Sequence, residues 1–196
     1  GYASSVITSV TAQNTIGVQG IHPIPTEMVR KQIESVMDDL HPNTIKIGMV
    51  CNHNIALTIA DCIRKYQPRW VIYDPVMIST SGHKLMTDDT IEIIKQKLIP
   101  MVSLITPNLL EARTLLENDL HDIKDMESGA KVLSLKYGCS VLIKGGHLED
   151  NDMCDILYEY CDEFSDTYTY TLGYFEGVDF VRCFTWTEIE RKTVDY

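Results

Sequence analysis

Residues 70–82, WVIYDPVMISTSG, are the stretch that decides the fold class of this chain. They begin with a short apolar, β-branched run, which predicts a buried strand better than a helix. The run ends at Asp74 and Pro75, because proline has no N–H to donate to a sheet. A hydroxyl-rich loop follows. An acid at the carboxyl end of a buried strand, before a polar loop, is typical of the edge at which open α/β sheets bind ligands.

The segments on both sides of this stretch alternate between strand and helix patterns. The pattern predicts strands over 5–11, 18–21, 44–50, 70–74, 102–105 and 140–144, and helices over 26–40, 52–65, 87–98 and 125–137 with another beginning near Asn108. Thr26 and Asn52 are expected as helix N-caps. Repeated βα units predict a mostly parallel sheet covered by helices. Alternating aromatic and threonine residues over 167–172 predict antiparallel edge strands.

Composition limits the kinds of partner. The chain has 196 residues, 44% of them hydrophobic, which is enough for one core and one domain. Its net charge of −11 argues against nucleic acid or an anionic membrane as a partner. The six cysteines form no C-x-x-C pair, so we expect reduced thiols and a cytoplasmic location.

Polar residues follow three of the predicted strands. Asp74 follows one strand, Asn108 and Glu111 the next, and Lys144 the last, so a parallel sheet would bring them to one edge. Asp74 and Glu111 are candidate Mg²⁺ ligands, directly or through water, and Lys144 is a candidate phosphate-binding residue. These residues also have purely structural interpretations: Asp74 as a turn former before proline, Asn108 as a helix N-cap and Lys144 as a strand end. The chain contains neither a P-loop nor a G-x-G-x-x-G fingerprint.

Six motifs in order support a more specific interpretation. They are TAQNT at 11–15, HPIP at 22–25, KIGM at 46–49, DPVM at 74–77, TPNLLEA at 106–112 and IKGGH at 143–147. In this series the chain resembles the hydroxymethylpyrimidine/phosphomethylpyrimidine kinases of thiamine biosynthesis, members of the ribokinase-like superfamily. The resemblance implies a three-layer α/β/α fold over a single domain, ATP and Mg²⁺ as cofactors, and a homodimer.

The resemblance also implies roles for individual residues. Gln13 matches the residue that hydrogen-bonds the aminopyrimidine edge, since an amide both donates and accepts. Met49 and Val76 match positions that pack against the ring. Asn108 and Glu111 match an N-x-x-E motif associated with magnesium and phosphate; these two, Asp74 and Lys144 form the expected cofactor site, with Asp74 and Glu111 as its metal ligands.

Two family segments do not occur in the sequence. One resembles GSDSSGGAGIQAD, and the other is a GTGC loop whose backbone N–H groups would stabilise the transferring phosphoryl group. We therefore expect residues 1–196 to be a kinase domain incomplete at both ends, and we assign no catalytic residue within them. The leading hypothesis is ATP-dependent phosphorylation of 4-amino-5-hydroxymethyl-2-methylpyrimidine and of its monophosphate. The alternatives are a pyridoxine/pyridoxal kinase and a non-catalytic ligand-binding module.

Overall fold

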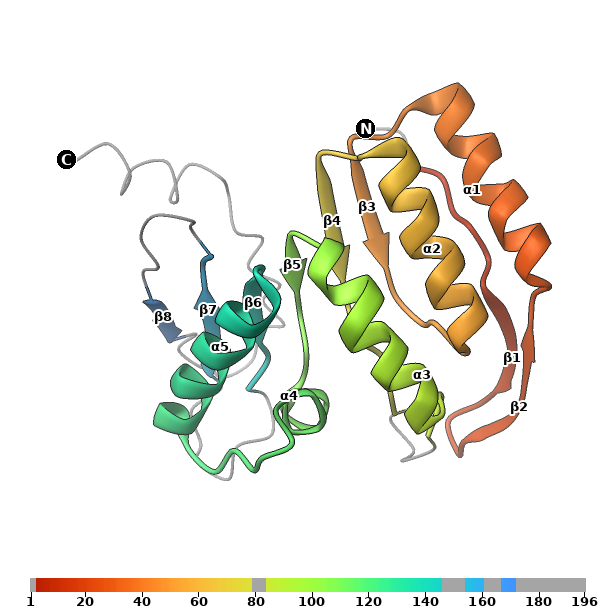
Figure 1. Ribbon diagram of the computed structural model, residues 1–196. Helices are drawn as coiled ribbons and strands as arrows, with labels where there is room; N and C mark the ends of the chain where they lie inside the picture. The colour runs from red at the N-terminus through yellow and green to blue at the C-terminus, as the bar shows by residue number, and fades with distance from the viewer. Residues whose placement is uncertain (1–2, 79–83, 146–153, 161–166, 172–196) are drawn as a thin grey trace, which may run out of the picture.

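The centre of the molecule is a six-stranded sheet whose strands lie in the order of the sequence. The computed structural model describes residues 3–78, 84–145, 154–160 and 167–171, which are coloured in Figure 1. The strands are β3 (Thr44–Ile47), β4 (Trp70–Tyr73), β5 (Leu104–Ile105), β6 (Ser140–Ile143), β7 (Cys154–Tyr158) and β8 (Thr167–Thr171). The strands β3 to β6 are parallel, and β7 and β8 add antiparallel pairs at one edge. This confirms the predicted fold class.

The helices follow the predicted apolar periodicity. They are α1 (Thr26–Leu40), α2 (His53–Tyr66), α3 (Asp88–Ile93), the π-helical turn η1 (Ile94–Leu98), the 3₁₀ turn η2 (Ile99–Met101), α4 (Leu109–Leu116) and α5 (Ile123–Tyr137). Asn52 caps α2 by accepting the N–H of Ile55, as predicted. Thr26 is not an N-cap: it already lies inside α1, and Pro25, which lacks a capping side chain, precedes it. No helix among the described residues is long and apolar enough to cross a membrane.

The two faces of the sheet differ in burial. Ile47, Tyr73 and Ile105 face the core, which also contains the apolar faces of α2 and α5. Because side chains alternate along a strand, the residues between them lie on the opposite face. On that face Ile72 and Leu104 are paired neighbours and are only partly buried. Lys46, Asp74 and Lys144 belong to the same, more open face, so their charged groups avoid the core.

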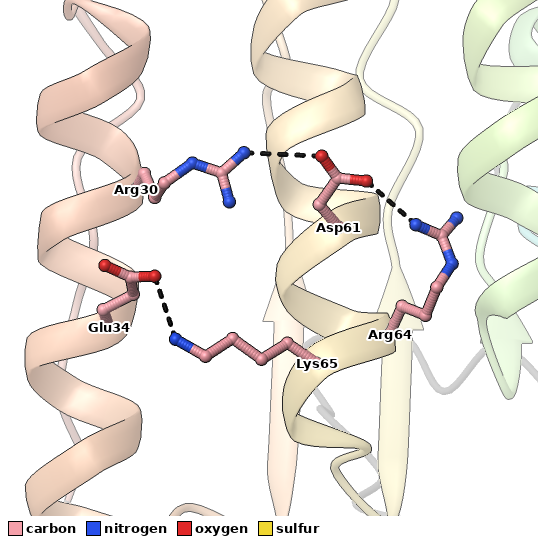
Figure 2. A network of polar contacts seen from close by, with 5 residues as sticks. All are labelled: Arg30, Glu34, Asp61, Arg64 and Lys65. Atoms are coloured by element: carbon pink, nitrogen blue, oxygen red, sulfur yellow. Dashed lines mark hydrogen bonds and ion pairs between the residues drawn. The ribbon is translucent and has the colours of Figure 1, made fainter.

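Helices α1 and α2 pack as a pair whose outer surface carries a network of ion pairs (Figure 2). Arg30 of α1 lies 3.4 Å from Asp61 of α2, and Asp61 also pairs with Arg64 at 2.9 Å. Glu34 and Lys65 form a second bridge between the helices at 3.0 Å. Asp61, Arg64 and Lys65 are exposed and Arg30 and Glu34 are partly exposed, so water and salt screen the pairs. We therefore expect each pair to contribute little to stability.

The hairpin of β1 (Ser9–Gln13) and β2 (Val18–Pro23) forms a separate two-stranded sheet (Figure 1). The sequence predicted the first strand over 5–11, which is wrong by several residues. Its bounds follow its antiparallel partner, since Ser9 pairs with Pro23 and Gln13 with Val18. The Thr8 hydroxyl donates a 2.9 Å hydrogen bond to the carbonyl of Met49 and joins the base of the hairpin to the end of β3.

Candidate functional site

Asp74 lies where β4 ends, and the backbone holds it at the carboxyl edge of the sheet. Its N–H donates to the carbonyl of Ile47 at the end of β3, at 2.8 Å. Its own carbonyl accepts the N–H of Val76 at 2.8 Å, so the chain turns directly after the strand. The Asp74 side chain is 22% exposed. Its carboxylate thus lies in a mostly shielded position that a ligand can still reach.

Two lysines pair with the Asp74 carboxylate. Lys144 Nζ lies 2.9 Å from Oδ1, and Lys46 Nζ lies 3.4 Å from Oδ2. Lys144 follows β6, so its side chain crosses the end of the short strand β5 to reach Asp74. The structure therefore brings together Asp74 and Lys144, which the sequence placed at one edge.

The lysines also set the charge state of Asp74. Partial burial alone would raise the pKa of this carboxyl group, because it disfavours the charged form. The hydrogen bond and charge of Lys144, together with Lys46, outweigh burial and hold the pKa of Asp74 below its usual value. Asp74 is therefore ionised at neutral pH.

Asn108 and Glu111 form a capping box at the start of α4. The N–H of Glu111 donates to Asn108 Oδ1 at 2.9 Å, and the N–H of Asn108 donates to Glu111 Oε2 at 2.8 Å. The structural interpretation of Asn108 as an N-cap is thus confirmed. The Lys144 N–H donates to the Pro107 carbonyl at 2.9 Å, which ties the end of β6 to this helix start.

Glu111 is buried, with 3% of its surface exposed. Burial raises the pKa of its carboxyl group, and the negative charge of Asp74 adds to this, although the Asn108 N–H and the Lys144 charge oppose it. Lys144, which pairs with Asp74, forms a parallel β-bridge with Asn108, and the Asn108 N–H binds the Glu111 carboxylate, so a chain of contacts joins Glu111 to the Asp74–Lys144 pair. All four residues of the expected cofactor site are therefore close to one edge of the sheet.

The carboxylates of Asp74 and Glu111 are already committed to protein partners. Both oxygens of Asp74 face lysines, and Glu111 Oε2 accepts a backbone N–H. Within the described part of the chain, no group of three His, Cys, Asp or Glu side chains is placed to hold a metal. Mg²⁺ usually keeps several of its waters and binds through them and through substrate phosphates. The two carboxylates can hold a hydrated Mg²⁺ in this way and keep their protein contacts.

The expected substrate residues lie on two parts of the fold. Met49 is half-buried after β3, and its Sδ accepts a 3.6 Å hydrogen bond from the Ser9 hydroxyl at the start of the hairpin. Val76 is half-buried after Asp74. Gln13 is exposed at the end of β1, and no hydrogen bond between described residues uses its side-chain amide. These positions suit ligand contacts, but the structure does not join all three directly.

Two further residues of this site did not emerge from the sequence. Lys46 pairs with Asp74, and a charged residue between Ile45 and Ile47 in a predicted buried strand was the signal for it. Asp155 on β7 accepts the N–H of Gly145 at 3.0 Å and fixes the backbone after Lys144. No sequence pattern predicts the role of Asp155, because its hydrogen bond to Gly145 depends on the antiparallel pairing of β6 and β7.

Comparison with solved structures defines the class of protein. The chain superposes on the crystal structure of phosphomethylpyrimidine kinase from Clostridium difficile 630 with a TM-score of 0.76 and 38% identity, over 85% of this chain and 71% of that one. An ADP complex of Bacillus subtilis pyridoxal kinase matches with a TM-score of 0.69 and 26% identity, over 86% and 62% of the chains. The fold is therefore that of the ribokinase-like vitamin kinases.

The sequence defines the family within that class. The family profile described as Phosphomethylpyrimidine kinase matches residues 1–172, and the chain belongs to this family. The hydroxymethylpyrimidine/phosphomethylpyrimidine kinase of Bacillus subtilis (strain 168) is 41% identical over 159 residues, which are 81% of this chain and 59% of that protein. The Escherichia coli (strain K12) protein of the same name is 39% identical, over 80% and 59%. The chain thus spans about three-fifths of the length of these relatives.

Proposed function

We propose that the whole protein transfers the γ-phosphoryl group of ATP to the hydroxymethyl oxygen of 4-amino-5-hydroxymethyl-2-methylpyrimidine, and then phosphorylates the resulting monophosphate, in thiamine biosynthesis. The observation that carries this proposal is the pairing of Asp74 and Lys144 beside the Asn108–Glu111 cap, whose glutamate is buried, within a chain of this family. A partly exposed lysine beside two carboxylates is the arrangement that phosphoryl transfer requires.

Each residue of the edge has a role in this proposal. Lys144 Nζ binds a nucleotide phosphate and neutralises part of its charge. Asp74 and Glu111 hold Mg²⁺ through water, and Asn108 fixes the position of the Glu111 carboxylate. The ion, when bound, supplies positive charge next to the phosphates. The ADP and AMP-PCP complexes of related pyridoxal kinases support ATP as the nucleotide.

The pyrimidine is proposed to bind where the hairpin meets the end of β3. Gln13 supplies a donor and an acceptor for the amino group and ring nitrogen, and Met49 and Val76 form apolar walls. The Thr8 and Ser9 contacts with Met49 support this placement, because they hold the base of the hairpin against the end of β3.

The deciding experiment is steady-state kinetics of the full-length protein with the aminopyrimidine alcohol and with pyridoxal. We expect kcat/KM to favour the pyrimidine. Pyridoxal phosphorylation is the second candidate function, which the similarity to Bacillus subtilis pyridoxal kinase supports. A clear preference for pyridoxal would select that candidate. Phosphorylation of neither compound would leave a ligand-binding module as the function.

The assigned pocket can be tested separately through Gln13. We expect Gln13→Ala to weaken binding of the pyrimidine alcohol by about 1–3 kcal/mol, the usual cost of leaving polar groups without their hydrogen bonds. Gln19→Ala, in the same hairpin and also exposed, is the control; its amide donates to Asn14 Oδ1 within the hairpin, and the variant should bind normally. Calorimetry measures both. Equal affinities of the Gln13 variant and the parent protein would contradict the pocket.

We also propose that the protein is a cytoplasmic homodimer. The free thiols of Cys51, Cys62 and Cys139 support a reducing compartment. The exposed apolar side chains of Val10 and Ile16 on the hairpin support an interface there. Sedimentation of the full-length protein tests the dimer, and a monomer at every concentration would contradict it.

A further inference from the structure

Each oxygen of the Asp74 carboxylate has a lysine of its own. Lys144 lies 2.9 Å from Oδ1 and Lys46 lies 3.4 Å from Oδ2. The two lysines come from opposite sides, because β3 and β6 flank β4 in the sheet, with β5 between β4 and β6. The contacts are also unequal: Lys144 is 40% exposed and makes the shorter contact, whereas Lys46 is 67% exposed.

The shielding of Asp74 makes its counter-ions important. Its carboxylate is 22% exposed, so an unpaired negative charge there would be costly. The proposed role of Lys144 requires its ammonium group to turn toward a nucleotide phosphate. If Lys144 were its only lysine partner, binding the nucleotide would leave no protein counter-ion on Asp74, and the Mg²⁺ proposed there would act only through water. Part of the phosphate-binding free energy would then be lost.

We propose that Lys46 is a positioning residue that compensates the charge of Asp74 when Lys144 moves to a nucleotide phosphate. This inference rests on the proposed nucleotide-dependent function. Lys46 suits the role because its longer contact can shorten without moving the backbone, and its exposed stem leaves the ammonium group free to follow the carboxylate. In the absence of nucleotide both lysines share Asp74, and with nucleotide Lys46 is the lysine that remains on it, beside the water-bound Mg²⁺ of the proposed function.

A double-mutant cycle tests whether Lys46 acts through Asp74. The affinity of the full-length protein for AMP-PCP is measured by calorimetry in the parent, Lys46→Met, Asp74→Asn and the double variant. We expect Lys46→Met to weaken binding about two- to fivefold, the range of a partly exposed ion pair. In the Asp74→Asn background, where no charge needs compensation, the same substitution should change the affinity little.

A matched control is available on α1. Lys31 is 66% exposed and pairs with Glu27 at 3.7 Å, so it resembles Lys46 in exposure and pairing but lies on a different element. Lys31→Met should leave AMP-PCP binding unchanged. Kinetics adds a readout that a general loss of structure would not give: Lys46→Met should raise KM for ATP with little change in kcat, and Lys46→Arg should restore KM.

The outcomes separate this inference from the proposed function. If the parent protein fails to bind AMP-PCP, the proposed function is wrong, and the inference fails with it. If the parent binds but Lys46→Met has no effect, the inference alone is wrong. An equal loss with and without the Asp74 carboxylate would show that Lys46 contacts the nucleotide directly, which also overturns the inference. A loss of AMP-PCP affinity on Lys46→Met that occurs in the parent protein but not in Asp74→Asn supports the inference.

Discussion

Asp74 combines partial burial with two positive neighbours, and this combination gives stability a defined pH dependence. Its folded-state pKa lies below the ordinary value of 3.8, chiefly because Lys144 and Lys46 outweigh burial. The stabilisation is therefore fully present above pH 3.8 and is lost as the pH falls through the lower folded-state value. We expect the stability advantage of the parent protein over Asp74→Asn to be constant at pH 5–7 and to shrink below about pH 4.

Urea unfolding at a series of pH values measures this difference. Comparison with Asp74→Asn is needed because Glu111 has the opposite behaviour: its raised pKa means that protonation favours the folded state as the pH falls. Since Glu111 is present in both proteins, much of its contribution cancels. A stability difference that stayed constant down to pH 3 would show that the lysines do not lower the pKa of Asp74.

Asn108 has both a structural role and a proposed functional one, and a second helix cap can separate them. Asp122 caps α5 as Asn108 caps α4, accepting the N–H of Asp125 at 2.8 Å. We expect Asn108→Ala and Asp122→Ala each to lower the free energy of unfolding by about 1 kcal/mol. Only Asn108→Ala should also reduce kinase activity, because it removes the Oδ1 acceptor for the Glu111 N–H and loosens the first turn of α4, which carries the Glu111 carboxylate. Equal activities in the two variants would contradict a functional role for this cap.

The sequence predicted some of these residues better than others. Asp74 and Lys144 were predictable because each follows an apolar strand, and parallel strands end at one edge. Lys46 was missed because the position of a residue within a strand does not reveal which neighbour its side chain meets. Its partner depends on the register of β3 against β4, in which Lys46 pairs with Ile72. This register is known only once the strands are assembled into the sheet.

At the scale of elements, two helix ends with the same backbone geometry carry different residues. The C-cap residue of α5 is Gly138, with φ of 69°, and that of α2 is Gln67, with φ of 46°, both in the left-handed region. A side chain is unfavourable there, and glycine is not. We expect Gly138→Ala to lower the free energy of unfolding by about 1 kcal/mol and Gln67→Gly to raise it by a few tenths. Urea denaturation of both variants tests the opposite signs, and shifts of the same sign would contradict this account.

The predicted helices were more accurate than the predicted strands. Helix α1 ends at Leu40 as predicted and begins at Thr26, one residue before the start that the predicted cap implies, since its apolar spacing is a local property of the chain. The predicted helix over 87–98 is α-helical only to Ile93 and continues as a π-helical turn, in which Lys95 is buried with Glu92 and Glu117 as partners. Strand β5 is only two residues long, because its bounds depend on pairing with β4 and β6. Such tertiary contacts are not encoded in local periodicity.

At the scale of the whole molecule, two regions of unequal burial meet at the proposed site. The sheet from β3 to β6 has a core face of fully buried residues, including Tyr73, Ile105 and Ile143. The hairpin of β1 and β2 is mostly exposed and forms its own small sheet. Regions with few buried apolar contacts open more readily than the core. The proposed nucleotide residues thus lie on the stable region, and Gln13 lies on the weaker one.

This division predicts the pattern of amide hydrogen exchange. We expect the amides of the hairpin to exchange well before those of β4 to β6 in the protein without ligand. The aminopyrimidine alcohol should slow exchange in the hairpin, because Gln13 would be held by the ligand. AMP-PCP alone should instead slow exchange around Asp74 and at the start of α4, where its phosphates would bind. Mass spectrometry of the full-length protein with each ligand measures both effects. Slower exchange in the hairpin with AMP-PCP alone would contradict the assignment of the two ligands to separate parts of the fold.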